Sequence, residues 1–404
     1  MKSAALESGR EGRWRLARVL WIAAIAVAAL LFAKSYVADL YRVRSQSMEP
    51  AIHGHPTEGE TVLVQYDRSP ELRRFDLVVL RRPLAPDAVV KRVVGLPGES
   101  IQIQAGDLIV NGRRLDPLAP RPEPIRLYGP GISAVEDTFH FQQAPDGPWT
   151  RDGDEWALDA RNVSPLSNSG MMFLSPDVRD EFLDANGERA QGLRQVGDVY
   201  LEAEFRFEDR PGRLRFDLVE EGDTFEAVLE HRGGGDIEAR LERWRQDQPA
   251  EVVASAELRV APDTWHRLRF RNVDNALVLE LTGHGVVLSQ AYERNQVYPG
   301  PTQEGDKSVG SRASLGAASL RCRFRNIAVG RDLHYTDQGV HGLTSAVTLG
   351  PGEYFLLGDN SADSRDSRFW GAVRADELVG VPRAVVLPWG RKRRLAGALE
   401  PWSD

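Results

Sequence analysis

The stretch Ser45-Gln46-Ser47-Met48-Glu49-Pro50 follows shortly after the most apolar run of the chain, Val19 to Ala33. A serine hydroxyl is a poor nucleophile until a base takes its proton, so the meaning of Ser47 depends on a base elsewhere in the chain. Serine and proline also mark helix N-caps and turns, and an ordinary turn serine is therefore the alternative interpretation.

A lysine within a run of valines offers such a base. Lys91 lies in Val89-Val90-Lys91-Arg92-Val93-Val94-Gly95-Leu96-Pro97-Gly98, whose composition predicts a buried strand. Burial without a carboxylate partner lowers the pKa of a lysine, and a neutral amine near the working pH is what a general base requires. The alternative is a lysine on the exposed face of an edge strand, where it guards against aggregation.

A third polar stretch near the C-terminus follows a predicted buried strand at 353–357. It reads Gly358-Asp359-Asn360-Ser361-Ala362-Asp363-Ser364-Arg365-Asp366-Ser367-Arg368-Phe369-Trp370-Gly371. A calcium-binding loop is one interpretation of its acidic and amide residues, but the spacing excludes it. Counted from Asp359, Ser364 stands where the sixth position needs glycine and Trp370 stands where the twelfth needs glutamate.

In this order the three stretches resemble those of the type I signal peptidases, which are membrane-anchored serine proteases with a lysine base. The resemblance covers about residues 10–117 and 349–388. It implies that Ser47 is the nucleophile and Lys91 the general base. It also implies that Ser45 donates its hydroxyl to the oxyanion hole beside the backbone N–H of Ser47, where fixed donors face the developing charge.

The resemblance implies further residues around the site: Ser364 to orient the lysine amine, Asp366 and Arg368 as a bracing ion pair, Met48 to pack beside the nucleophile, and Val90 to line the substrate pocket. The implied substrates are secretory preproteins with small residues before the cut, in the Ala-x-Ala style. The resemblance implies no cofactor.

The N-terminus carries a basic segment and then a predicted membrane anchor. Residues 1–18 hold five basic side chains against two acidic ones, and residues 19–38 reach the length of about 20 that a span needs if Lys34 extends to the interface. The positive flank predicts a cytoplasmic N-terminus, so the single-pass protein would sit in the cell membrane with the rest of the chain outside. A cleaved signal peptide is the alternative. The C-terminal run Arg391 to Arg394 is predicted to be solvated near lipid headgroups.

Composition narrows the remaining classes of partner. The 404 residues suggest two or three domains, and the net charge of -8 argues against nucleic acid as a partner. The single cysteine, Cys322, excludes an internal disulfide and a cysteine metal cluster. His53 and His55 form the closest histidine pair but have no further ligand cluster beside them, so we predict no metal site.

Alternating apolar residues with closely spaced turns predict a mainly β fold. We expect an antiparallel catalytic core at 39–124 and 346–404, split by an inserted β-sandwich at 125–345. The core strands are predicted at 61–66, 75–80, 88–94, 101–104, 107–110, 353–357 and 379–387, with a tight turn at Asn111-Gly112. The strands of the insertion are predicted at 199–207, 213–219, 225–231, 237–244, 251–260, 265–270, 276–281, 286–290 and 319–329.

The late strands of the insertion, with the turn Asp274-Asn275 between 265–270 and 277–281, are similar to those of concanavalin-like and laminin-G-like jelly rolls. This resemblance implies an architecture and not sugar binding, so a glycan or another envelope partner stays open. We expect the insertion to fold by itself, outside the chemistry. The alternative function is an inactive anchored binding protein that acts through the sandwich. A self-cleaving regulator would need a DNA-binding module that residues 1–40 cannot hold.

Overall fold

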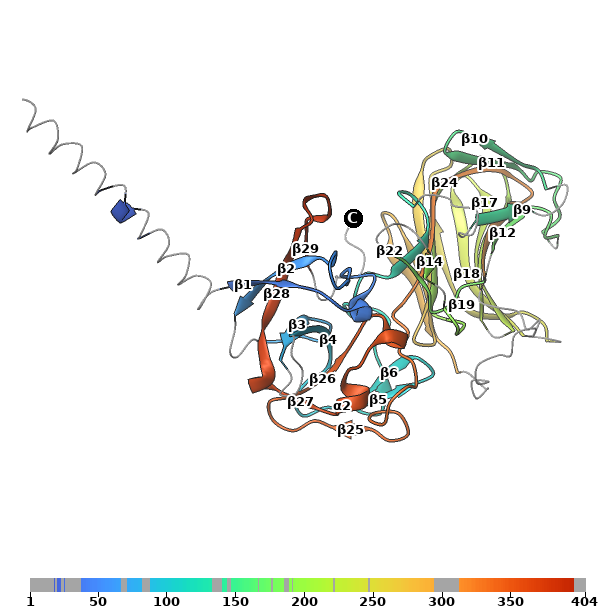
Figure 1. Ribbon diagram of the computed structural model, residues 1–404. Coiled ribbons are helices and arrows are strands. Elements are labelled where there is room, and N and C mark those ends of the chain that lie inside the picture. Colours follow the sequence, from blue (N-terminus) through green and yellow to red (C-terminus); the bar gives the residue numbers. More distant parts are fainter. Residues whose placement is uncertain are drawn as a thin grey trace, which may run out of the picture.

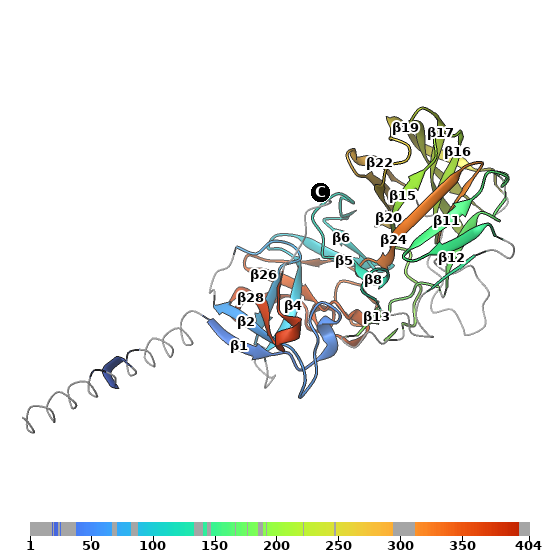
Figure 2. The same ribbon diagram turned by 90° about the horizontal axis from the view of Figure 1, so that it is seen from above.

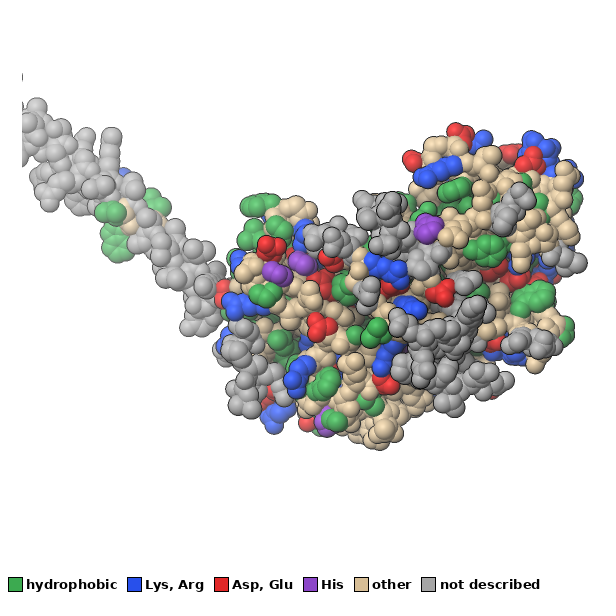
Figure 3. All heavy atoms as spheres, turned by 45° about the vertical axis from the view of Figure 1, so that its right-hand side comes forward, with side chains coloured by type: hydrophobic (Ala, Val, Ile, Leu, Met, Phe, Trp, Pro, Cys, Tyr) green, Lys and Arg blue, Asp and Glu red, His purple; other side chains and the backbone are tan. Residues whose placement is uncertain are grey.

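The architecture is taken from a computed structural model. It describes residues 18, 20–22, 25, 38–66, 71–81, 88–132, 140–143, 147–165, 167–175, 177–184, 189–190, 192–220, 222–245, 248–293 and 312–395. Two β bodies lie side by side: the core, which holds the first and the last described strands of the chain, and the sandwich, which is formed by the strands between them (Figures 1 and 2). On the face drawn in Figure 3, acidic and basic side chains are spread over both bodies.

The core is built on an antiparallel sheet that interleaves the two ends of the chain. Its strand order is β1-β2-β28-β3-β4-β26-β27, with β29 paired to β28. The strands are β1 (Ala38–Arg42), β2 (Thr61–Tyr66), β28 (Leu378–Leu387), β3 (Leu77–Leu80), β4 (Val89–Gly95), β26 (Glu353–Leu357), β27 (Val373–Arg374) and β29 (Arg393–Arg394). Because β28 lies between β2 and β3, the sheet is complete only when the C-terminal part of the chain has joined it.

A smaller sheet completes the core, in the order β25-β5-β6-β7. Its strands are β25 (Val347–Thr348), β5 (Ser100–Gln104), β6 (Asp107–Val110) and β7 (Arg113–Arg114). The turn between β6 and β7 is formed by Asn111 and Gly112, whose φ angles of 52° and 76° are both left-handed. Asparagine and glycine tolerate that conformation at little cost, so the predicted tight turn forms there.

The sandwich packs two larger sheets face to face. One contains β10 (Trp149–Asp152), β11 (Glu155–Asp159), β24 (Arg321–Arg331), β15 (Val199–Phe207), β20 (His266–Val273), β21 (Ala276–Leu281), β22 (Gly285–Ala291) and β8 (Ile125–Tyr128). The other contains β19 (Glu251–Arg259), β18 (Asp236–Trp244), β17 (Asp223–Gly233), β16 (Gly212–Glu220), β23 (Arg312–Ala318), β12 (Met171–Ser175) and β9 (His140–Gln143). A large apolar cluster between them includes the buried rings of Phe205, Phe216, Phe270 and Phe324. A separate two-stranded pair consists of β13 (Phe182–Leu183) and β14 (Arg189–Ala190).

The chain enters and leaves the sandwich at one place. β8 pairs with the end of β24, with Ile125 opposite Arg331. After β24 the chain returns to the core, where Tyr335 packs into the apolar cluster around Phe75 and Phe355. The backbone N–H of Tyr335 donates to the carbonyl of Gly106 at 3.1 Å. Tyr335 thus packs with residues of the core, although the expected range of the insertion, 125–345, includes it.

The mainly β prediction is confirmed, and the predicted strands are present with ends shifted by at most a few residues. Sequence reasoning missed β1, β7 to β14, β23, β25, β27 and β29. Among the described residues, no helix is both long and apolar enough to cross a membrane. Fifteen of the twenty residues of the expected anchor at 19–38 lie outside the described residues, and its last residue, Ala38, is the first residue of strand β1.

Candidate active site

Three segments that are far apart in the sequence converge in the core. The short 3-10 helix η1 (Gln46–Met48) carries Ser47 and lies against β4, which carries Lys91, and against η2 (Ser361–Asp363). η2 is followed by the short helix α2 (Ser367–Trp370), and both belong to the third stretch singled out in the sequence. The backbone N–H of Asn360 donates to the carbonyl of Ser47 at 3.2 Å, so the third stretch is tied directly to the serine.

Ser47 and Lys91 face one another across a buried contact. The Nζ of Lys91 lies 2.5 Å from the Oγ of Ser47. Ser47 is 5% exposed and Lys91 is 2% exposed. The lysine is buried because β4 is an inner strand of the core sheet, with β3 on one side and β26 on the other. A nucleophile and a base within hydrogen-bond distance are the arrangement that covalent catalysis requires.

Burial sets the protonation of the lysine. It lowers the pKa of Lys91 from 10.5 to about 8. The charges of Asp366, Asp359 and Asp363 raise this pKa, whereas that of Arg368 lowers it, and the burial effect is the largest. Desolvation disfavours the charged amine, so a sizeable fraction of Lys91 is neutral at mildly alkaline pH.

Ser45 lies at the open side of the serine. It precedes η1 in an extended conformation, is exposed, and has its Oγ 3.2 Å from the Oγ of Ser47. A hydroxyl at this distance can reach an oxygen atom bound next to Ser47. This is the position that a side-chain donor to an oxyanion would occupy.

Ser364 lies beside Ser47, but its hydroxyl has no hydrogen-bond partner within the described part of the chain. The residue is 5% exposed. A Cβ added at Gly358 would collide with both the Ser364 hydroxyl and the carbonyl of Ser47, so only glycine lets the two segments come this close. The expected contact between Ser364 and the Lys91 amine is therefore not among the hydrogen bonds of this structure. A free buried hydroxyl is nevertheless available close to the pair.

Two buried ion pairs brace the third stretch. Arg368 and Asp366 are both fully buried and are joined by two hydrogen bonds, from Nε to Oδ1 at 2.9 Å and from Nη2 to Oδ2 at 2.7 Å. Arg92, next to Lys91 on β4, pairs with Asp359 through Nε to Oδ1 at 2.7 Å and Nη2 to Oδ2 at 2.5 Å. Sequence reasoning did not assign the Arg92–Asp359 pair. The signal was available, because an arginine in a run of valines needs a buried acid.

Apolar residues pack next to the segments that carry Ser47 and Lys91. Met48 is fully buried and packs in one cluster with Val90, Ile52 and Val62. Val90 is 6% exposed and precedes Lys91 on β4. The expected packing residue and the expected pocket residue thus lie in the same cluster next to the nucleophile.

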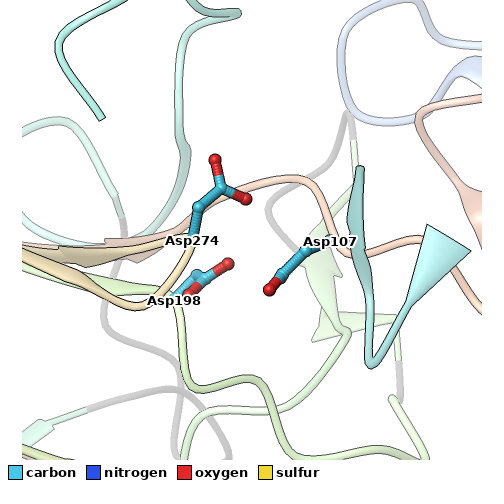
Figure 4. A group of neighbouring side chains, drawn as sticks. All are labelled: Asp107, Asp198 and Asp274. Carbon is cyan, nitrogen blue, oxygen red and sulfur yellow. The ribbon is translucent and has the colours of Figure 1, made fainter. Parts of the chain in front are cut away.

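A group of carboxylates lies away from these residues, at the joint between the two bodies (Figure 4). Asp107 on β6, Asp198 before β15 and Asp274 between β20 and β21 each offer one oxygen within 4.8 Å of the others. Arg114 donates to Asp107 at 3.0 Å, and Arg121 pairs with Asp274. Oxygen ligands of this kind suit a hard cation, but two of the three carboxylates already have arginine partners.

The two histidines considered as metal ligands make separate local contacts. The Nδ1 of His53 lies 2.7 Å from Oε1 of Glu49, and the Nδ1 of His55 accepts from the backbone of Glu58 at 3.1 Å. Both rings thus make contacts within the loop between η1 and β2.

Comparison with known proteins identifies the class of this chain. A family model described as signal peptidase, peptidase S26, matches residues 16–168 and 284–389, which is more than half of the chain. The chain belongs to this family. The unmatched segment between the two matches lies within the sandwich.

Individual relatives agree with this assignment. Signal peptidase I V of Bacillus subtilis (strain 168) is 27% identical over 178 residues, which cover 41% of this chain and 96% of the relative. Signal peptidase I of Bacillus caldolyticus is 36% identical over 133 residues, which cover 31% of this chain and 69% of the relative.

Similar solved structures include the carbohydrate binding module CBM66 from Bacillus subtilis, with a TM-score of 0.30 and 13% identity, covering 47% of this chain and 94% of the module. A Bacillus licheniformis beta-glucanase has a TM-score of 0.33 and 9% identity, and the match covers 51% of this chain and 98% of the glucanase. These TM-scores are too low to support an argument about the sandwich.

Proposed function

We propose that the protein is a membrane-anchored serine endopeptidase that removes N-terminal signal peptides from exported preproteins. The observation that carries the proposal is the buried contact between Ser47 and Lys91, with 2.5 Å between Oγ and Nζ. Membership of the signal peptidase family supports the same reaction. The coupling of a serine to a lysine whose pKa is lowered to about 8 supplies the chemistry.

The reaction begins with the neutral amine of Lys91, which takes the proton of the Ser47 hydroxyl while Oγ attacks the scissile carbonyl carbon. The carbonyl oxygen becomes an oxyanion, which accepts hydrogen bonds from the Ser45 hydroxyl and the backbone N–H of Ser47. When the tetrahedral intermediate collapses, the C–N bond breaks and the lysine gives its proton to the leaving amine. Lys91 is then neutral again, and it deprotonates a water molecule that hydrolyses the acyl-enzyme.

The surroundings of the pair fit a substrate with apolar side chains before the cut. Met48 and Val90, which are the chain neighbours of Ser47 and Lys91, are buried in one apolar cluster. The substrate segment would lie extended along a strand edge of the core, because strand addition aligns a backbone without reading most of its side chains.

The division of the chain follows from the same proposal. The anchor lies within residues 19–37 and has a cytoplasmic N-terminus, and lipid surrounds it. Residues 39–124, together with the segment from Tyr335 onward, form the peptidase outside the membrane. The sandwich between them is an added body that contributes neither Ser47 nor Lys91.

The proposal is tested with purified full-length protein in detergent and a fluorogenic peptide spanning an Ala-x-Ala cleavage site. We expect cleavage after the last small residue, and none with Ser47→Ala. A wild-type protein that binds such peptides without cleaving them would instead support the alternative of an inactive anchored binding protein. Cleavage that survives Ser47→Ala would refute the assignment of the nucleophile.

A further inference from the structure

The strap that leads from the sandwich back into the core, residues 332–336, ends at the active-site arginine. Thr336 is the fifth residue after the last residue of β24, Arg331, and is 1% exposed. Its carbonyl accepts a hydrogen bond from Nη1 of Arg368 at 3.0 Å, and its Oγ1 accepts one from the same nitrogen at 2.6 Å. Both N–H groups of Nη1 are therefore directed at this single residue.

Thr336 also holds the other end of the third stretch. Its backbone N–H donates to the Oγ of Ser361 at 2.8 Å, and its own hydroxyl lies 3.4 Å from the Ser361 carbonyl. The remaining acceptors of the Arg368 guanidinium are the carbonyls of Ser361 and Ser364 and the carboxylate of Asp366. Among the described residues, Thr336 is thus the partner of this guanidinium that comes from outside residues 361–366.

The start of the strap is fastened to both bodies. The backbone N–H of Asp332 donates to the carbonyl of Asp198 in the sandwich at 2.9 Å, and that of Tyr335 donates to Gly106 of the core at 3.1 Å. The side chain of Asp332 pairs with Arg121 at 3.3 Å. The strap therefore runs from a contact with the sandwich at Asp332 to contacts with the core at Tyr335 and Thr336.

We infer that Thr336 is a positioning residue of the proposed peptidase: by holding Arg368, it keeps the carboxylate of Asp366 at a fixed place near Lys91. The effect of Thr336 on catalysis rests on the proposed function, whereas its hydrogen bonds to Arg368 and Ser361 do not depend on it. In this proposal the strap links the sandwich to Arg368, and the sandwich itself contributes no residue that contacts the substrate.

Loss of the Thr336 contact should raise the pKa of Lys91. The charged groups that act on Lys91 are Asp366, Asp359, Arg368 and Asp363. If the guanidinium of Arg368 loses its anchor and moves away, its positive charge no longer opposes protonation of Lys91, and the carboxylate of Asp366 is less well neutralised. Both changes favour the protonated lysine, so the pKa of Lys91 rises and the activity at neutral pH falls.

The test compares Thr336→Val, which keeps the shape but removes the hydroxyl acceptor, with Thr336→Ser, which keeps the hydroxyl. Thr348→Val is the matched control, because Thr348 is an exposed threonine of the core strand β25. We expect Thr336→Val to lower kcat near pH 7 by about three- to tenfold with KM changed by less than about twofold, since one buried N–H loses its partner. The acidic limb of its pH profile should lie at higher pH, and Thr336→Ser and Thr348→Val should match wild type.

Two outcomes would overturn the inference. One is a pH profile of Thr336→Val that coincides with wild type, with a loss of kcat that follows only the folded fraction. The other is an equal loss in Thr336→Ser, which would assign the effect to the methyl group. If the valine variant does not fold, Thr336→Ala takes its place. Its thermal midpoint shows whether it folds, and the acidic limb of its pH profile is compared with that of wild type.

A readout independent of cleavage separates this inference from the proposed function. The chain contains five lysines, so the 13Cε signals of labelled lysine are few, and Lys91→Arg assigns the one of interest. Titration of this signal in wild type and Thr336→Val gives the pKa of Lys91 directly. A protein that cleaves no signal peptide would refute the proposed function, whereas an unchanged Lys91 titration in Thr336→Val would refute the role of Thr336.

Discussion

The activity of this protein should follow the deprotonation of Lys91, with half-maximal kcat/KM near pH 8. Lys91 is 2% exposed, and burial lowers its pKa from 10.5 to about 8. A lysine with an ordinary pKa would be neutral in only about 0.3% of molecules at pH 8, so burial increases the fraction of free amine about 150-fold at that pH. The protonated amine cannot accept the serine proton, and activity is therefore lost as the pH falls through this value.

The measurement is kcat/KM for a fluorogenic signal peptide between pH 6 and pH 10.5, with Ser47→Ala as the blank. A second variant checks the sign. Asp363 is exposed and its charge raises the pKa of Lys91, so Asp363→Asn should move the acidic limb slightly toward lower pH. The reasoning would be refuted by an acidic limb near pH 10, or by a limb that moves to higher pH in Asp363→Asn.

Five variants test the remaining assignments. Ser47→Ala and Lys91→Ala should each abolish peptide cleavage measured by mass spectrometry, because a nucleophile and its base act as a unit; appreciable turnover by either would contradict the pair. Ser45→Ala should lower kcat by about 10²–10³-fold, as for one lost oxyanion donor, and a rate within twofold of wild type would remove Ser45 from the site. Asp366→Asn should lower the free energy of unfolding in urea by about 3–5 kcal/mol, because it leaves the fully buried Arg368 without its charge partner; an unchanged midpoint would show that the pair is not structural. Replacing residues 126–331 with a Gly/Ser linker should largely preserve cleavage of a short peptide in the same fluorogenic assay, and loss of cleavage in a folded core would show that the sandwich supplies part of the site.

Many of the strands could be predicted because their signals are local. The run at 89–94 has valines on both faces, which suits only an inner strand of a sheet, and β4 has β3 and β26 on its two sides. The turn at Asn111-Gly112 needs two left-handed residues in a row, and few dipeptides allow it. In such places the composition of a short segment already determines its structure.

The missed features depend on partners that are distant in the sequence. β23 (Arg312–Ala318) is made mostly of small residues with little preference for a strand, and its conformation comes from pairing with β16 and β12. Thr336 lies in a stretch with no motif, and its contact with Arg368 depends on the path of the chain after β24. Sequence reasoning places Tyr335 in the insertion for the same reason, because its packing in the core cluster depends on the path of the chain after β24.

The placement of the insertion explains how a sandwich can interrupt a catalytic sheet. β8 and the end of β24 pair with each other, so the two ends of the insertion are adjacent. The core can therefore accommodate the insertion at a position where a short surface loop would also fit. Closing a longer loop between fixed ends adds only about 0.6 kcal/mol for each doubling of its length. The sandwich also has an apolar cluster of its own between its two sheets.

The order of the chain adds a consequence for assembly. β26 and β28 follow the sandwich in the sequence, and β28 lies between β2 and β3. During synthesis from the N-terminus the catalytic sheet therefore stays incomplete until the sandwich has been made. Arg92 gains its partner Asp359 only at that stage, and Arg368 and Asp366 arrive with the same segment. The lysine thus acquires its charged surroundings last, after the strap with Thr336 has been made.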